Sequence, residues 1–162
     1  HVRAAFDDEV TVILDGGPCQ IGIESSVIDL SDGKPILLRP GGVPLEVLEN
    51  ALGQVITTSM CSIDNPRSPG ILGPHYSPSI PLHLDTLLSG PGEALLAFGQ
   101  VTGATLNLSA SGDLREAAAN LFAHLHTLDD GQYSSIAVTP IPDDGLGRAI
   151  NDRLRRAATS EE

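Results

Sequence analysis

A proline-rich stretch near the middle of the chain constrains its fold more than any other feature. Five prolines and two glycines lie between Asn65 and Pro81 inclusive. Proline fixes its own backbone angle and removes a hydrogen-bond donor, so no regular helix or central strand can run through this stretch. Because proline also stiffens an extended connector, the sequence predicts a semi-rigid linker over residues 60–80. The linker divides the chain into a first part, residues 1–59, and a last part, residues 81–162.

The first part alternates short apolar runs with glycine turns. Val10–Leu14, Ser26–Leu30 and Ile36–Leu38 are predicted strands, because each is apolar and ends at turn-forming residues. The second and third of these strands are expected to form a hairpin across residues 31–34. Leucines spaced three and four residues apart after Pro44 predict a helix with one apolar face.

The last part alternates apolar runs with helical patterns. Four runs bounded by turns are predicted strands, namely Pro81–Leu84, Ala94–Phe98, Ala104–Leu108 and Ser134–Val138. Asp113 is expected to begin a helix in the manner of a capping box, with Glu116 three positions later. A terminal helix is predicted from Gly145 onward, and its arginines are interpreted as neutralising acidic neighbours. This order of elements predicts an α/β fold with a mostly parallel sheet covered by helices.

An excess of acidic residues excludes several classes of function. The formal net charge of -12 argues against a protein that binds nucleic acid by neutralising phosphates. Aromatic residues make up 3% of the chain, too few for base-stacking platforms. No apolar run reaches the ~20 residues of a membrane helix, and Cys19 and Cys61 form no disulfide framework. We therefore expect a cytoplasmic protein with no direct nucleic-acid partner and no membrane partner.

Polar residues that could meet an anionic ligand gather in the first part. Ser25 and Ser26 follow Glu24 where a glycine-rich turn enters a strand, and hydroxyls at such a place can donate to a carboxylate or phosphate. A turn in which serine caps its own backbone is the alternative. Arg39 ends a strand, where ligands of α/β proteins bind, and its planar fork suits phosphate. A surface salt bridge of Arg39 is the alternative there.

A histidine and a tyrosine lie side by side in the proline-rich stretch. His75 and Tyr76 would be unusual in a connector that is only a spacer. The linker could fold back as a lid, with Tyr76 offering a hydroxyl and a ring face to a ligand. In the alternative, Tyr76 anchors the linker to a domain surface. No metal site is predicted, because neither cysteine belongs to a CxxC pair.

Several strings, taken together, resemble the two-domain YrdC-like family of threonylcarbamoyl-AMP synthases. They cover nearly the whole chain in order, as Leu14–Gly17, Gly22–Asp29, Leu37–Gly41, Ser68–Gly70, His75–Pro78 and Gly145–Ala158. The resemblance implies the C-terminal part of a twisted α/β YrdC-like sheet domain over residues 1–59. It implies the proline-rich linker over residues 60–80 and a small Rossmann-like α/β accessory domain over residues 81–162.

The resemblance also implies an enzyme, a nucleotidyltransferase. Members of the family form threonylcarbamoyl-AMP and pyrophosphate from L-threonine, bicarbonate and ATP, and the product serves threonylcarbamoyladenosine formation in tRNA. By position, Ser25 would contact threonine, Arg39 and Tyr76 would contact ATP, and Ser26 and His75 are additional candidates. ATP would act as a substrate with Mg²⁺ bridging its phosphates, and a downstream tRNA threonylcarbamoyl transferase would be the partner.

The chain departs from the family pattern in three ways. The family's N-terminal half, with its Lys-x-Arg and Ser-x-Asn motifs, does not occur in this sequence, which begins at His1 without a Met. We therefore expect an excerpt from a longer polypeptide that is inactive alone. Ser26 stands where the family usually has threonine, and Gly73 and Pro74 replace the basic residue that usually precedes His-Tyr. A non-catalytic α/β module that binds a nucleotide or a partner protein remains the alternative, and a tRNA-binding domain fits the charge least.

Overall fold

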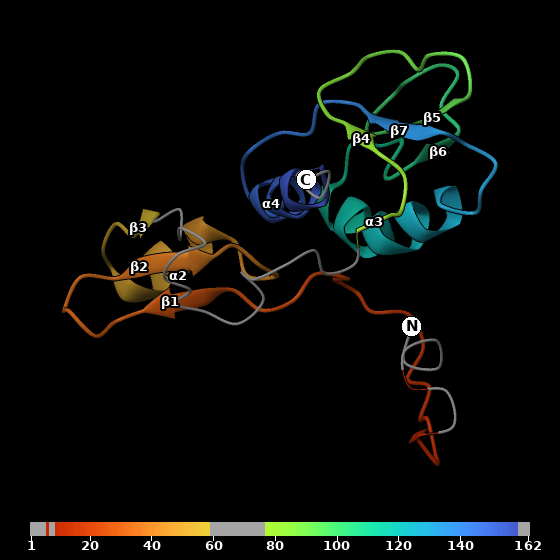
Figure 1. Cartoon of the computed structure of the whole chain (residues 1–162). Helices are drawn as coiled ribbons and strands as arrows, with labels where there is room; N and C mark the ends of the chain where they lie inside the picture. Colours follow the sequence, from red (N-terminus) through yellow and green to blue (C-terminus); the bar gives the residue numbers. More distant parts are fainter. Residues whose placement is uncertain (1–5, 7–8, 59–76, 159–162) are drawn as a thin grey trace.

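The computed structural model of the 162-residue chain describes residues 6, 9–58 and 77–158. Its helices and strands form two units, each built on its own sheet (Figure 1). In chain order they are β1 (Val27–Asp29), β2 (Ile36–Arg39), α2 (Leu45–Leu52), β3 (Thr57–Thr58), β4 (Leu82–His83), β5 (Glu93–Ala97), β6 (Leu106–Asn107), α3 (Leu114–Leu128), β7 (Ser135–Val138) and α4 (Gly147–Ala158). We call the described residues 9–58 the N-terminal unit and residues 77–158 the C-terminal unit. The predicted linker lies largely outside the described residues, and the predicted domain boundaries stay predictions.

The N-terminal unit is a three-stranded sheet in the order β1-β2-β3. β1 and β2 form the predicted antiparallel hairpin, and β3 runs parallel to β2. The helix predicted after Pro44 is confirmed as α2, which ends at Gly53 in the left-handed conformation (φ 66°). None of the α2 residues is buried, so its apolar face is covered only in part. Buried apolar side chains of this sheet are few, with Leu37, Leu38 and Ile56 the main ones.

The strand predicted over Val10–Leu14 is wrong. These residues adopt no strand, and the side chains of Val12 and Leu14 are 67% and 91% exposed. A strand needs a neighbour that satisfies its backbone groups and covers one of its faces. No described strand pairs with this segment. Its β-branched side chains therefore lie on no sheet, and composition alone does not make the segment a strand.

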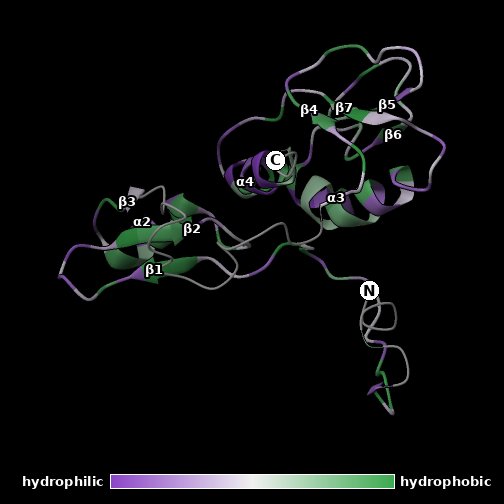
Figure 2. Ribbon diagram, viewed as in Figure 1, coloured by the Kyte–Doolittle hydropathy of each residue, from purple (hydrophilic) through white to green (hydrophobic). Residues whose placement is uncertain are grey.

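The C-terminal unit is a four-stranded sheet in the order β4-β7-β5-β6, and every pairing in it is parallel. This confirms the α/β class and the four strands predicted in this part. α3 and α4 lie below the sheet in the view of Figure 1 and contribute side chains to one apolar cluster with β5 and β7. Figure 2 shows apolar residues along β4 and β7 and a mixture of apolar and polar residues along both helices, as expected for helices with one buried face.

Asp113 caps the start of α3 as predicted, but the hydrogen bonds around it differ from those of a capping box. The Asp113 side chain accepts hydrogen bonds from the backbone N–H groups of Arg115 and Glu116, at 2.7 and 3.4 Å, as an N-cap should. Glu116 does not return a bond to the Asp113 backbone, as a capping box would. The Asp113 N–H instead donates to the buried Ser109 Oγ at 3.0 Å, and Ser109 Oγ donates to the Glu116 carboxylate. Asp113 and Glu116 are therefore linked through Ser109, a residue outside the helix, and not directly as in a capping box.

Helix α3 is anchored by leucines that are fully enclosed by the sheet and α4. Leu121 has no exposed surface, whereas Leu88, in a loop of the same unit, is 76% exposed. Among the described residues no helix is long and apolar enough to cross a membrane.

The Leu121→Ala variant should lower the free energy of unfolding by about 2–5 kcal/mol, because a buried leucine loses its transfer energy and leaves a cavity. Leu88→Ala makes the same chemical change at an exposed position and should alter the free energy by less than about 0.5 kcal/mol. Urea denaturation followed by circular dichroism would measure both. Equal losses for the two variants would contradict the position of the core.

Candidate functional site

Ser25 and Arg39 meet where the hairpin of the N-terminal unit opens. β1 begins at Val27 and β2 ends at Arg39, and these two residues are register partners. Because the strands are antiparallel, residues just before β1 lie beside the end of β2. The Arg39 guanidinium donates to the Ser25 carbonyl oxygen, from Nη2 at 3.0 Å and from Nε at 3.3 Å, and Nη2 lies 3.4 Å from Ser25 Oγ. The structure thus brings together two of the predicted site residues.

Ser26 fastens the same segment to the chain after β2. Its hydroxyl donates to the Val43 carbonyl oxygen at 2.6 Å and accepts from the Val43 N–H at 3.2 Å. The hydroxyl therefore has two backbone partners, and a contact of Ser26 with a ligand stays a prediction. Its observed role is to hold residues 24–26 against residues 40–43.

Glycine is required where these two segments cross. A Cβ atom on Gly41 would lie 2.3 Å from the Ser25 carbonyl carbon and 2.4 Å from the Glu24 carbonyl oxygen, closer than real Cβ atoms approach. The neighbouring Gly42 N–H donates to the same Glu24 oxygen at 2.8 Å. The Pro-Gly-Gly turn thus lets the two backbones pack directly on each other, which fixes the position of Ser25 relative to Arg39.

The C-terminal unit reaches this site through Arg153 of α4. The Arg153 guanidinium donates to the Glu24 carboxylate, from Nε at 2.9 Å and from Nη2 at 2.8 Å, and Nη1 donates to the Pro40 carbonyl oxygen at 3.2 Å. The Arg153 side chain is only 9% exposed. Sequence reasoning missed this role, although one signal was present. Arg153 lies three residues after Ile150 and next to Leu154, so it belongs to the buried face of the helix rather than to its solvent face.

The segment that precedes Glu24 docks on the C-terminal unit. Ile23 is 7% exposed and belongs to the same apolar cluster as the α3 leucines. A Cβ on Gly22 would lie 2.9 Å from the Ala118 carbonyl oxygen, so this segment runs directly against the α3 backbone. Arg115 Nη2 adds a hydrogen bond to Gln20 Oε1 at 3.0 Å. Residues 20–24 therefore contact both the C-terminal unit and the chain after β2.

The Glu24 carboxyl is kept ionised by its surroundings. Partial burial alone would raise its pKa above the ordinary value of 4.5. Hydrogen bonds from its own backbone N–H and from Arg153, together with the charges of Arg153 and Arg39, outweigh burial and lower the pKa. The site thus holds a fixed anion beside two guanidinium groups.

Two predicted site residues, His75 and Tyr76, lie outside the described residues, so their approach to Ser25 and Arg39 stays a prediction. Among the residues that the structure describes, no group of three or more His, Cys, Asp or Glu side chains is arranged to hold a metal ion.

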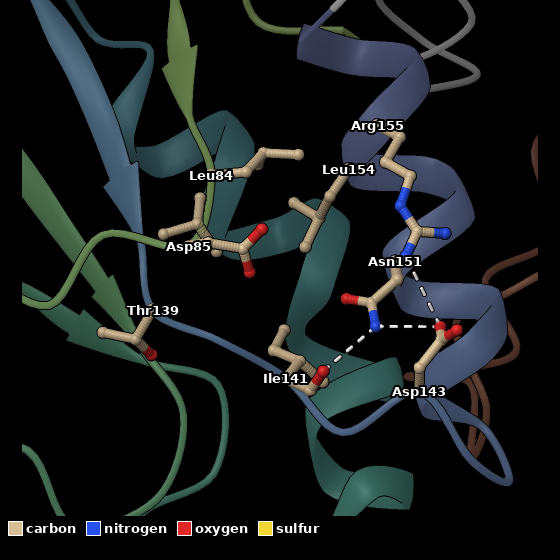
Figure 3. A pocket seen from close by; sticks show the side chains of 9 residues that line it. Leu84, Asp85, Thr139, Ile141, Asp143, Asn151, Leu154 and Arg155 are labelled. Carbon is tan, nitrogen blue, oxygen red and sulfur yellow. Dashed lines mark hydrogen bonds and ion pairs between the residues drawn. The ribbon is translucent and has the colours of Figure 1, made fainter.

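A separate cavity of about 230 Å³ lies at the carboxyl ends of β4 and β7, against α4 (Figure 3). Asn151 lines it and is fixed by hydrogen bonds to the Ile141 carbonyl oxygen at 3.0 Å and to Asp143 at 3.2 Å. Asp85 has a left-handed backbone (φ 56°), and its carboxylate points into the cavity in Figure 3. None of the lining residues belongs to segments 24–26 or 39–43.

Comparison with protein families gives two adjoining matches. The model described as threonylcarbamoyl-AMP synthase, C-terminal domain, matches residues 43–159. The model described as telomere recombination matches residues 1–41. The boundary between the two matches falls between β2 and α2, directly after the Pro-Gly-Gly turn begins.

Curated relatives match along nearly the whole chain. The threonylcarbamoyl-AMP synthase of Pyrococcus abyssi is 33% identical over 98% of this chain and 52% of its own length. The threonylcarbamoyl-AMP synthase of Bacillus subtilis is 32% identical over 98% of this chain and 51% of its own length. A crystal structure of P. abyssi Sua5 complexed with L-threonine superimposes with a TM-score of 0.82 at 30% identity, covering 99% of this chain and 53% of that one. The chain therefore spans about half the length of the relatives it matches.

The Gly41→Ala variant should displace segment 24–26, because the added methyl group cannot fit against the Ser25 and Glu24 backbone. We expect a loss of about 1–3 kcal/mol in the free energy of unfolding and faster amide hydrogen exchange in residues 24–26. Gly16→Ala is the matched control, since a Cβ there meets no atom within 4 Å. Unchanged exchange in Gly41→Ala would contradict the close crossing.

The Glu24–Arg153 ion pair should make stability depend on pH. Because the folded state lowers the Glu24 pKa, its stabilisation is present above the unfolded value of 4.5 and is lost as the pH falls through the lower folded pKa. The difference in free energy of unfolding between the parent chain and Glu24→Gln should therefore shrink as the pH falls from about 6 to about 3. In an Arg153→Ala background the pH dependence of that difference should be weaker. A difference that stays constant over the range would count against the pair.

Proposed function

The chain belongs to the threonylcarbamoyl-AMP synthase family, and we propose that it forms the C-terminal part of an enzyme that makes threonylcarbamoyl-AMP. The substrates would be L-threonine, bicarbonate and ATP, and the second product would be pyrophosphate. The observation that carries the proposal is the junction of Ser25 and Arg39, in which a hydroxyl and a guanidinium are held 3.4 Å apart on a backbone that glycine locks. The solved relative complexed with L-threonine supports threonine as a substrate.

Each group has a role that its chemistry suits. The Ser25 hydroxyl would hydrogen-bond the bound threonine, and the Arg39 guanidinium would face the phosphates of ATP, with which its planar fork forms strong charge-assisted bonds. Tyr76 would contact the nucleotide from the linker. Ser26 would act through the Val43 backbone, and His75 is a further candidate beside Tyr76. None of these groups needs to form a covalent bond with the substrate.

The proposed reaction requires the protein to position the substrates and to stabilise the charge that develops in the transition state. The threonine amine attacks the carbon of bicarbonate, and loss of one water molecule leaves a carbamate. A carbamate oxygen then attacks the α-phosphorus of ATP while pyrophosphate leaves. Such a step is accelerated by holding the attacking and leaving oxygens in line and by neutralising the developing charge. Arg39 would serve the second purpose. The Mg²⁺ expected with ATP would be held by its phosphates, since the described residues offer no cluster of metal ligands.

The product would pass to a tRNA threonylcarbamoyl transferase in the cytoplasm. The net charge of -12 is unfavourable for direct contact between this part of the enzyme and tRNA. Because the chain spans about half of its relatives, we expect residues 1–162 alone to release no pyrophosphate.

The Arg39→Ala variant of the full-length protein tests the proposal. The KM for ATP in a pyrophosphate-release assay should rise about tenfold or more, because a charge-assisted contact with phosphate is lost. Arg155→Ala removes the same side chain from a 61% exposed position on α4 and should leave the KM unchanged. An unchanged KM for ATP in Arg39→Ala would favour the alternative of a non-catalytic module.

A further inference from the structure

Arg153 contacts the residues next to both proposed substrate-binding side chains. Its partner Glu24 directly precedes Ser25, and its other partner, the Pro40 carbonyl oxygen, directly follows Arg39. These three contacts come from one side chain that is nine-tenths buried. A single residue of α4 therefore spans the two segments whose crossing fixes the Ser25–Arg39 junction.

The Arg153 guanidinium is itself held in place. Asp152, its neighbour on α4, accepts a hydrogen bond from Arg153 Nη1 at 2.5 Å and forms an ion pair with Arg156, whose Nε lies 3.0 Å away. Contacts within α4 therefore orient the Arg153 guanidinium independently of its contact with Glu24. A planar guanidinium held in this way can orient the Glu24 carboxylate. The flexible ammonium group of a lysine could only supply charge.

Removal of this side chain would loosen both segments at once. Buried ionic groups are costly when they lose their partner, so the half-buried Glu24 would move toward water. The Glu24 carbonyl oxygen also accepts the hydrogen bond from the Gly42 N–H. Movement of Glu24 therefore strains the same backbone crossing that places Ser25 beside Arg39.

We propose that Arg153 is a positioning residue for the substrate site. Through Arg153, the C-terminal unit contributes to the geometry of that site. The proposal rests on the proposed function, since it assigns Arg153 a role in binding L-threonine through Ser25. The Arg153 guanidinium does not touch the substrate. It acts by holding Glu24 and Pro40, and the effect should therefore appear in the binding of threonine more than in the rate of the bound complex.

A second ion pair between the two units provides a matched control. Arg148 Nη1 of α4 lies 3.0 Å from Glu46 Oε1 of α2, with side chains 25% and 50% exposed. This pair joins the same helix to the same unit, but it does not reach residues 24–26 or 39–43. If the two units only needed to be held together, loss of either arginine would have a comparable effect.

The experiment compares Arg153→Ala, Arg153→Lys, Glu24→Gln and Arg148→Ala in the full-length protein, with pyrophosphate release as the assay. Arg153→Ala and Glu24→Gln should raise the KM for L-threonine about tenfold with kcat within about threefold of the parent. Arg153→Lys should restore part of the loss, because it keeps the charge but not the second contact. Arg148→Ala should behave as the parent. Hydrogen exchange in residues 24–26 and 40–42 should quicken in Arg153→Ala and not in Arg148→Ala.

Two results would overturn the proposal. One is an unchanged KM for threonine in both Arg153→Ala and Glu24→Gln. The other is a loss of activity that follows only the fraction of folded protein, with KM unchanged, which would make the ion pair merely structural. A parent protein that releases no pyrophosphate would instead refute the proposed function. Glu24→Gln and Arg153→Lys keep the test decisive if Arg153→Ala does not fold.

Discussion

The direct packing of one backbone on another at Gly41 is the constraint on which the candidate site depends. Ordinary side chains would separate residues 24–26 from residues 40–43 by several ångströms. Without a Cβ at Gly41, the two segments meet within hydrogen-bond distance, as the bond from Gly42 to Glu24 shows. The crossing lies next to the bond from Arg39 to the Ser25 carbonyl oxygen, which the antiparallel pairing of β1 and β2 brings about. A rigid crossing suits the proposed function, in which the site would act by placing substrates.

The N-terminal unit draws much of its order from the C-terminal unit. Its own strands are two to four residues long, and few of its apolar side chains are buried. Sheets this small are marginal alone in water. Ile23 compensates by entering the core of the C-terminal unit, and Arg153 closes the same interface with an ion pair between residues 129 positions apart. The stability of the site is therefore inseparable from the stability of the neighbouring helices.

Local elements could be predicted from the sequence, whereas the contacts that complete the site could not. The hairpin, the parallel sheet and the helices α2, α3 and α4 follow from periodicity and turn residues, and these predictions are confirmed. Val10–Leu14 has the composition of a strand, yet a strand exists only where a partner lies beside it, and composition says nothing of partners. Ser25 and Arg39 were singled out because a hydroxyl at the start of a strand and a guanidinium at the end of one suit anionic ligands, and the observed hairpin brings the two together. Arg153 was missed because no local rule connects α4 with a turn near the start of the chain.

The position of Arg153 explains why an arginine, among the many on α4, is buried at all. Burial of a guanidinium costs several kcal/mol unless its donors are matched, and an apolar residue would fill the same space at lower cost. In compensation, a buried guanidinium can specify an arrangement that apolar packing would leave loose. Here the donors match a carboxylate and a carbonyl oxygen that flank the Ser25–Arg39 junction. A leucine at this position could bury the same interface, but it could not orient Glu24, and orientation is what a substrate site requires.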